Sequence, residues 1–322
     1  MNSFPASASR LECLRGVTWV LRMKSGCVTC LLFLAGGLFG PALLRADELA
    51  EAQALIAADR LPEAREPLER LVASRPDDLD ARLTLAGVYH GLGRREEGMR
   101  LLEPVLETHA DDARVLGIYA GQCLLQAGEL GMGFRALVLA RRGREMMERA
   151  VALAPNEISY REALVDFYRQ APGFAGGSMA KARAHAEAIT RIDPVRGGAW
   201  LAALLIDEGR HEEALAACDA ALAARPDDYV ALFTLGKTVS ESGLRLADGE
   251  AALRRCLEMR PSASEPSHAG VWHRLGLIAE LSGDLEAARA AQRRALELEP
   301  HFTRPAEALR RLERAGLLSG SD

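Results

Sequence analysis

Residues 269–300 carry the pattern that most constrains the fold of this chain. Apolar and small residues recur every three or four positions over residues 269–281 and again over residues 285–298, and Gly283-Asp284 separates the two segments. This spacing predicts two amphipathic helices joined by a tight turn, the second of which ends before Pro300. The predicted packing faces contain Trp272, Leu275, Gly276 and Ala279 in the first helix, and Leu285, Ala288, Ala291, Ala295 and Leu298 in the second. Several of these residues are small, so the two helix axes can pack closely.

The pattern recurs along the chain. A residue that ends a predicted helix returns every 32 to 45 positions, at Pro76, Ala110, Pro155, Pro194, Pro226, Pro261 and Pro300. The repeated unit resembles the tetratricopeptide (TPR) repeat, a helix-turn-helix of about 34 residues. The resemblance covers residues 47–302 and implies an all-α fold, a right-handed superhelical α-solenoid of about seven such units. Residues 303–322 contain one more amphipathic segment, which we expect to be a capping helix over the open end of the stack, followed by a short tail.

The first 46 residues differ from the repeats. Met23-Lys24 precedes an apolar run from Cys27 to Leu44, and Ala46 is followed by acidic residues. This order is typical of a secretory signal peptide, and it predicts a mature N-terminus at Asp47. Because the segment is long for a signal, we expect translation to start at Met23. Export would make the protein periplasmic or secreted, with no integral membrane span after cleavage. The alternative is an uncleaved segment that anchors the protein to the inner membrane.

Charge and cysteine content narrow the class of partner. Removing residues 1–46 takes away five cationic side chains and one anionic one, so the formal charge changes from −5 to −9. An acidic chain argues against nucleic acid and against anionic membrane surfaces as partners. The pair Cys27 and Cys30 lies inside the predicted signal. Cys123, Cys218 and Cys256 remain, each on an apolar helix face, and we expect buried thiols there rather than a disulfide.

Catalytic and ligand-binding motifs are incomplete in this sequence. His211-Glu212 begins like a zinc-binding helix, but Leu215 stands where the second histidine is required. The glycine-rich segment 170–181 lacks the Gly-Lys-Ser/Thr of a phosphate-binding loop, so an ordered surface loop is expected there. The sequence therefore predicts no enzyme activity, no cofactor and no metal site.

The TPR resemblance implies a function. Proteins of this family are scaffolds that bind peptides or helices of partner proteins in a concave groove, which is lined by the first helix of each unit. The implied function is thus a non-catalytic adaptor for a protein or peptide partner in the bacterial cell envelope. The positions that carry over to the groove are His90, Gln122, Gln126, Arg161, Tyr168, Asp207, Lys237, Glu241, His273 and Glu280. Their mixed polarity favours an extended segment or helix of mixed polarity as the ligand.

The third unit departs from the pattern. Residues 132–153 read as one uninterrupted helix with a basic surface formed by Arg135, Arg141, Arg142 and Arg144. This helix either docks an acidic partner or carries a solvated basic face over a longer core helix. A second possible function is that of a purely structural accessory subunit of an envelope assembly. Exposed apolar area in the groove would favour a peptide binder, whereas such area on the convex side or at one end would favour the subunit.

Overall fold

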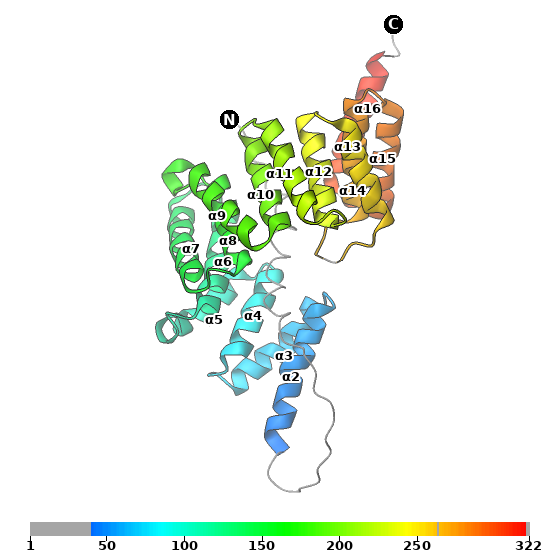
Figure 1. The fold of residues 1–322 in the computed structure, drawn as a ribbon. Coiled ribbons are helices and arrows are strands. Elements are labelled where there is room, and N and C mark those ends of the chain that lie inside the picture. Colours follow the sequence, from blue (N-terminus) through cyan, green and yellow to red (C-terminus); the bar gives the residue numbers. More distant parts are fainter. Residues whose placement is uncertain (1–39, 263, 320–322) are drawn as a thin grey trace. The chain divides into compact units, whose positions relative to one another are not determined.

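The computed structural model describes residues 40–262 and 264–319, and the side chains of residues 48–262 and 264–314. Within these ranges the chain forms helices and no β-strand, and most of the helices pack in consecutive pairs (Figure 1). We call the first helix of each pair the A helix and the second the B helix. The packed pairs are α2 (Gly40–Ala57) and α3 (Leu61–Ser74), α4 (Leu79–Gly91) and α5 (Arg95–Thr108), α6 (Ala113–Leu130) and α7 (Phe134–Leu153), α10 (Pro194–Asp207) and α11 (His211–Ala224), α12 (Tyr229–Ser242) and α13 (Leu246–Glu258), and α14 (His268–Leu281) and α15 (Leu285–Leu298). In the fourth predicted repeat, α8 (Ile158–Gln170) and α9 (Met179–Ile192) follow one another in the same order, but α8 packs on α7 and α9 packs on α10. The all-α solenoid with seven predicted repeats is confirmed.

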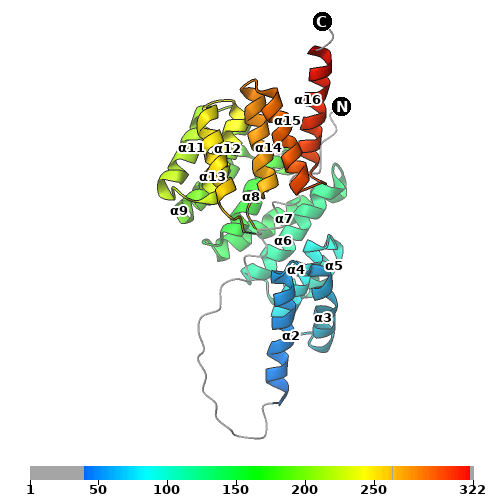
Figure 2. The same cartoon turned by 90° about the vertical axis from the view of Figure 1, so that its right-hand side faces the viewer.

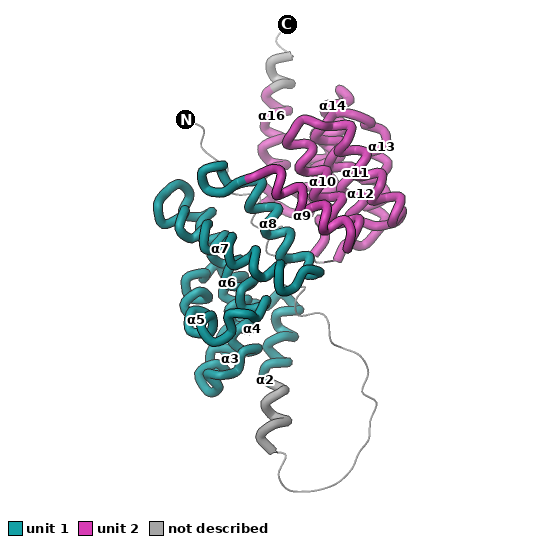
Figure 3. The backbone as a smooth tube through the Cα atoms, turned by 60° about the vertical axis from the view of Figure 1, so that its left-hand side comes forward, with its two compact units in different colours: residues 1–177 teal, residues 178–322 magenta. Residues whose placement is uncertain are grey.

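The chain divides into two compact units after Gly177 (Figure 3). The division falls in the loop between α8 and α9, the two helices of the fourth predicted repeat. This loop contains a short 3-10 helix, η2 (Gly173–Ala175).

Most of the predicted signal segment lies outside the described residues. Helix α2 begins at Gly40, so the predicted cleavage point after Ala46 falls within it. No helix of the described part of the chain combines the length and the apolar run that a membrane crossing requires.

Acidic residues that follow the helix-ending prolines cap the next helices. Asp78 Oδ1 accepts a hydrogen bond from the backbone N–H of Ala81 at 3.0 Å. Asp228 Oδ1 accepts from the N–H groups of Val230 and Ala231 at 2.9 and 3.1 Å. These bonds satisfy donors that the start of a helix leaves unpaired, so the two aspartates set where α4 and α12 begin.

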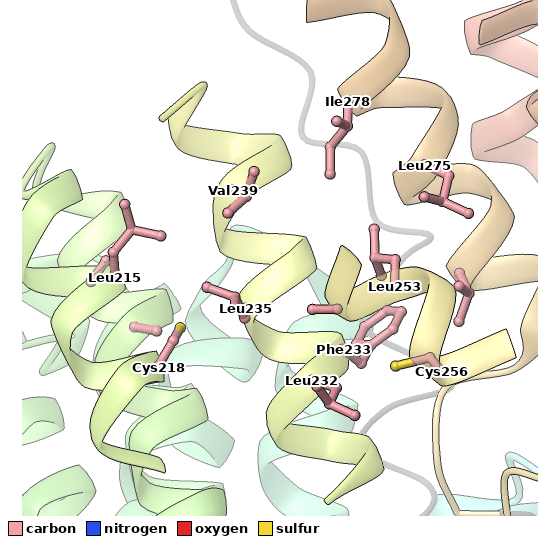
Figure 4. Close-up of a cluster of buried hydrophobic side chains, with 14 of the residues drawn as sticks. Leu215, Cys218, Leu232, Phe233, Leu235, Val239, Leu253, Cys256, Leu275 and Ile278 are labelled. Atoms are coloured by element: carbon pink, nitrogen blue, oxygen red, sulfur yellow. The ribbon is translucent and has the colours of Figure 1, made fainter. Parts of the chain in front are cut away.

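The core of unit 2 lies between its consecutive helices. Figure 4 shows side chains from α11 to α14 gathered in one cluster, which includes Leu215, Cys218, Phe233, Leu253, Cys256 and Ile278. All three cysteines of the described residues are buried free thiols, as the sequence predicts. The final helix α16 (Thr303–Ser319) packs on α15 (Figure 2). Its Ala308 and Leu312 side chains are buried. The capping position expected for this helix is therefore observed.

Helices α6 and α7 form the longest A–B pair, with 18 and 20 residues. Helix α7 is unbroken, as predicted, but it starts at Phe134 rather than Met132, after a turn that includes Gly131 and Gly133. Gly143 is buried against α6, where a Cβ would lie 2.9 Å from Leu124 Cγ and 3.0 Å from Cys123 Cβ. The glycine therefore lets the two helices approach closely and does not end α7.

Candidate functional site

Four of the ten predicted groove residues are buried. Gln122 has no exposed surface, Tyr168 is 1 % exposed, and His90 and His273 are also buried. The prediction that these four side chains line an accessible groove is therefore wrong. Each of them has a structural position that explains its burial.

Gln122 fills space between three helices of unit 1. Its Nε2 donates to the carbonyl oxygen of Ala86 on α4 at 3.2 Å, and its carboxamide lies beside Gly98 on α5. His90 lies one turn after Ala86 on α4. Burial, together with the nearby charge of Arg95, lowers the pKa of His90 to about 4. Both residues therefore belong to the interior of unit 1.

Tyr168 belongs to the contact between α7 and α8. Its hydroxyl donates to Glu148 on α7, and burial raises its pKa above the ordinary tyrosine value. Tyr89 on α4 makes the same kind of contact two helix pairs earlier, where its hydroxyl donates to Glu69 Oε1 at 2.9 Å. In both cases the glutamate lies 20 residues before the tyrosine. This spacing between a glutamate and a tyrosine, shared by Tyr89 and Tyr168, is the sequence signal that could have identified Tyr168 as a packing residue.

Arg161 and Gln126 are half-buried residues of unit 1. Arg161 Nε donates to the carbonyl oxygen of Pro155 at 2.9 Å, across the turn that precedes α8. Arg82 makes the same bond to Pro76 before α4. Arg161 therefore has a structural role at the start of its helix. A variant that removes Arg161 and Tyr168 would therefore perturb folding.

His273 is held by a glutamine from the B helix of its own repeat. Its Nδ1 lies 2.8 Å from Gln292 Oε1, and Gln292 Nε2 donates to the His273 carbonyl at 3.2 Å. Burial lowers the pKa of His273 to about 4, although the Gln292 bond opposes that shift. The neighbouring Arg274, and not His273, reaches the preceding A helix, α12. The positions carried over from repeat to repeat point to His273 and not to Arg274. Consecutive residues of a helix point about 100° apart, so Arg274 faces a different direction.

The remaining predicted positions lie on the A helices of unit 2. Helix α12 packs between α10 and α14. Arg274 Nη1 on α14 donates to Glu241 Oε1 at 2.9 Å and to Ser240 Oγ at 3.2 Å, both on α12. Lys237 precedes Glu241 by four residues, so the two side chains share one face of α12. We call Lys237, Glu241 and Glu280, together with the buried Arg274 that pairs with Glu241, the unit 2 A-helix surface.

The two ends of this surface are bounded by different contacts. Next to the N-terminal end of α14, Phe233 on α12 lies close to Gly270. Toward the C-terminal end of α14, Glu280 Oε2 accepts from Arg311 on α16 at 2.6 Å. Asp207 is exposed at the last position of α10. The surface therefore carries charges of both signs, as the sequence predicts for this part of the chain.

The predicted basic helix is α7, and its arginines are engaged to different degrees. Arg135 Nη2 pairs with Glu96 at 2.7 Å, and Arg141 Nε pairs with Glu145 at 2.9 Å. The Arg142 guanidinium stacks over the Tyr119 ring at 4.8 Å, and Arg144 is half-buried. The arginines do not converge on one point, so α7 offers a basic face rather than a pocket.

Burial affects the reactivity of the cysteines in the described part of the chain. Burial raises the pKa of the Cys218 thiol to about 11 and that of Cys123 to about 11, so neither is a thiolate at neutral pH. Among the residues with described side chains, no group of three histidine, cysteine, aspartate or glutamate residues is placed to hold a metal ion.

Comparison with known proteins identifies the repeat. Models of the tetratricopeptide repeat match residues 43–121 and residues 269–302. A tetratricopeptide repeat protein from Parabacteroides merdae is 15 % identical with a TM-score of 0.59, and the match covers 84 % of this chain and 98 % of that one. A thermophilic TPR protein of Thermus thermophilus is 18 % identical with a TM-score of 0.51, over 61 % and 98 % of the two chains. No curated protein matches. At these identities the solved structures establish the fold alone.

Proposed function

Because this chain belongs to the tetratricopeptide-repeat family, we propose that it is a non-catalytic scaffold of the bacterial cell envelope that binds a partner protein across its A helices. We assign the binding role to the unit 2 A-helix surface. The partner segment would lie over α12 and α14 and would carry polar groups of both signs.

The observation that carries this proposal is the environment of Lys237. Among the residues that the structure describes, Lys237 has no ion-pair partner, whereas Glu241 beside it is neutralised by Arg274. Lys237 is half-buried and shares a helix face with Glu241. A carboxylate of a bound segment would form an ion pair with the Lys237 ammonium group. That contact would fix the register of the segment on the surface.

Photo-crosslinking tests this proposal whatever protein the partner is. A photoreactive amino acid at position 237 is expected to give one discrete adduct in cells that produce the protein. The matched control is position 286 on the B helix α15, where the Glu286 side chain is 88 % exposed. Adducts of equal yield at both positions, or none at position 237, would reject the A-helix surface as the binding site.

Export to the envelope is the second part of the proposal. It rests on the sequence of residues 23–46 and is tested by N-terminal sequencing of the protein recovered from its native cells. We expect Asp47 as the first residue. A chain that retains Cys27 and Cys30 would favour the uncleaved membrane anchor.

One observation favours the alternative of a structural accessory subunit. Five large apolar side chains are exposed around the α6–α7 turn: Leu130, Met132, Phe134, Leu137 and Val138. Most of this apolar area lies on the turn and on a B helix, not on the A helices of unit 2. A permanent assembly partner would cover such an area.

A further inference from the structure

The start of α7 exposes an apolar stripe. Phe134 is 84 % exposed, and Leu137 and Val138 are exposed at the third and fourth positions after it. This spacing places the three side chains on one face of the helix. Met132, which is 77 % exposed, precedes them in the turn. We call these four residues the α7 stripe.

The opposite face of α7 is already packed. Ala136, Ala140, Gly143 and Met147 are buried, and α7 makes its main contact with α6. The helix therefore cannot rotate to bury the stripe without exposing this face. The stripe therefore faces solvent while α7 is held in place by its packing against α6.

Arginines accompany the stripe, and its own stretch of chain supplies no carboxylate. Residues 130–144 contain four arginines and no acidic residue. Arg135 and Arg141 are paired with Glu96 and Glu145, but both pairs are exposed to solvent. Exposed pairs of this kind contribute little to stability, so a ligand carboxylate can replace their partners at little cost.

We propose that the α7 stripe docks an amphipathic helix of a partner protein, one whose apolar face is flanked by aspartate or glutamate side chains. Apolar residues at helical spacing form the ridge that fits between the ridges of a second helix. The surrounding arginines select carboxylates at the edges of that contact. A second copy of this chain would bring arginine against arginine.

Two synthetic helical peptides test the proposal with the mature protein. Both carry the same leucine stripe, flanked by glutamate in one peptide and by lysine in the other. Fluorescence anisotropy is expected to give at least a tenfold lower Kd for the glutamate peptide. The double variant Phe134→Ser with Leu137→Ser is expected to raise the Kd for the glutamate peptide at least tenfold. The control Leu281→Ser removes an exposed apolar side chain from α14 and should leave the Kd unchanged.

Other results would overturn the inference. Equal affinity for the two peptides, no binding of either, or undiminished binding by the double variant rejects the acidic helix as occupant. A dimer in sedimentation velocity that the double variant dissolves would assign the stripe to a second copy. Binding to phosphatidylglycerol vesicles that the double variant abolishes would assign it to lipid. These measurements do not involve Lys237, so their failure is distinguishable from failure of the A-helix surface.

Discussion

The carboxamide of Gln122 occupies the space that a side chain at position 98 would need. A Cβ placed on Gly98 would lie 2.1 Å from Gln122 Oε1. The seventh repeat has a related arrangement, in which a Cβ on Gly276 would lie 2.3 Å from Gln292 Nε2. In both places a buried amide fills a helix interface and makes a hydrogen bond to a backbone carbonyl. Each glutamine side chain therefore leaves no room for a Cβ at the position it faces, and glycine is required there.

This contact predicts an unusual response to Gly98→Ala. Alanine favours a helix by about 1 kcal/mol over glycine, but here its methyl group would displace a fully buried amide from Ala86. We expect a net loss of about 1–3 kcal/mol in the free energy of unfolding. Gly87→Ala in α4 is the control, because a Cβ there meets no atom within 4 Å, and it should stabilise the protein. Urea denaturation measures both, and a stabilised Gly98→Ala variant would contradict the packing described.

The buried histidines predict a loss of stability in mild acid. The pKa values of His90 and His273 are lowered to about 4 in the folded chain, against about 6.5 when unfolded. Between these values the unfolded chain binds more protons, so the free energy of unfolding falls as the pH drops from 6.5 toward 4. Above pH 7 the contribution is constant. The expected loss is up to about 2 kcal/mol per histidine at pH 5.

Variants without the titrating group separate this effect from that of the carboxylates. Urea unfolding of the wild type, His90→Gln and His273→Gln is compared at pH 7.5 and pH 5.0. Each variant is expected to lose less stability than the wild type between the two pH values. An identical loss in all three proteins would show that the histidines do not drive the pH dependence.

Two salt bridges of unit 2, Arg274–Glu241 and Arg254–Glu250, are expected to contribute differently to the free energy of unfolding. The Arg274 side chain is almost fully buried, so Glu241→Ala removes a carboxylate from a desolvated guanidinium. We expect a loss of about 1–3 kcal/mol. Glu250→Ala removes the partner of Arg254 in a pair that is exposed on both sides, and should change stability by less than about 0.5 kcal/mol. Equal effects in thermal or urea unfolding would mean that Arg274 finds another partner.

The sequence predicts the helix pairs well because their packing residues repeat. Small residues such as Ala288 and Ala295 recur at fixed spacing, and prolines follow most of the B helices, so seven helix pairs can be counted from the sequence. Each element needs only local information, namely the apolar period and the residues that end a helix. The uninterrupted α7 is predictable for the same reason.

The accessible surface is harder to predict because it depends on what neighbouring helices leave open. Gln122 is polar, but the missing side chain at Gly98 makes room for it in the core. His273 and Arg274 differ by one position, and only the packing of α14 against α12 decides which of them reaches Glu241. These details depend on the side chains of neighbouring helices. The pattern of one repeat contains no information about those side chains.

The loop between α8 and α9 gives the last prediction. A Cβ on Gly177 would lie 1.7 Å from the carbonyl oxygen of Ala171, and its N–H donates to the Pro172 carbonyl at 3.1 Å. Since the obstacle is backbone, Gly177→Ala has to open the loop. We expect faster limited proteolysis between Ala171 and Ser178 in this variant. Gly173→Ala is the control, because a Cβ there meets no atom within 4 Å, and its cleavage rate should match that of the wild type. A cleavage rate of Gly177→Ala equal to that of the wild type would show that the loop accommodates a side chain at position 177. The close turn from Ala171 to Gly177 would then not be what keeps this segment ordered.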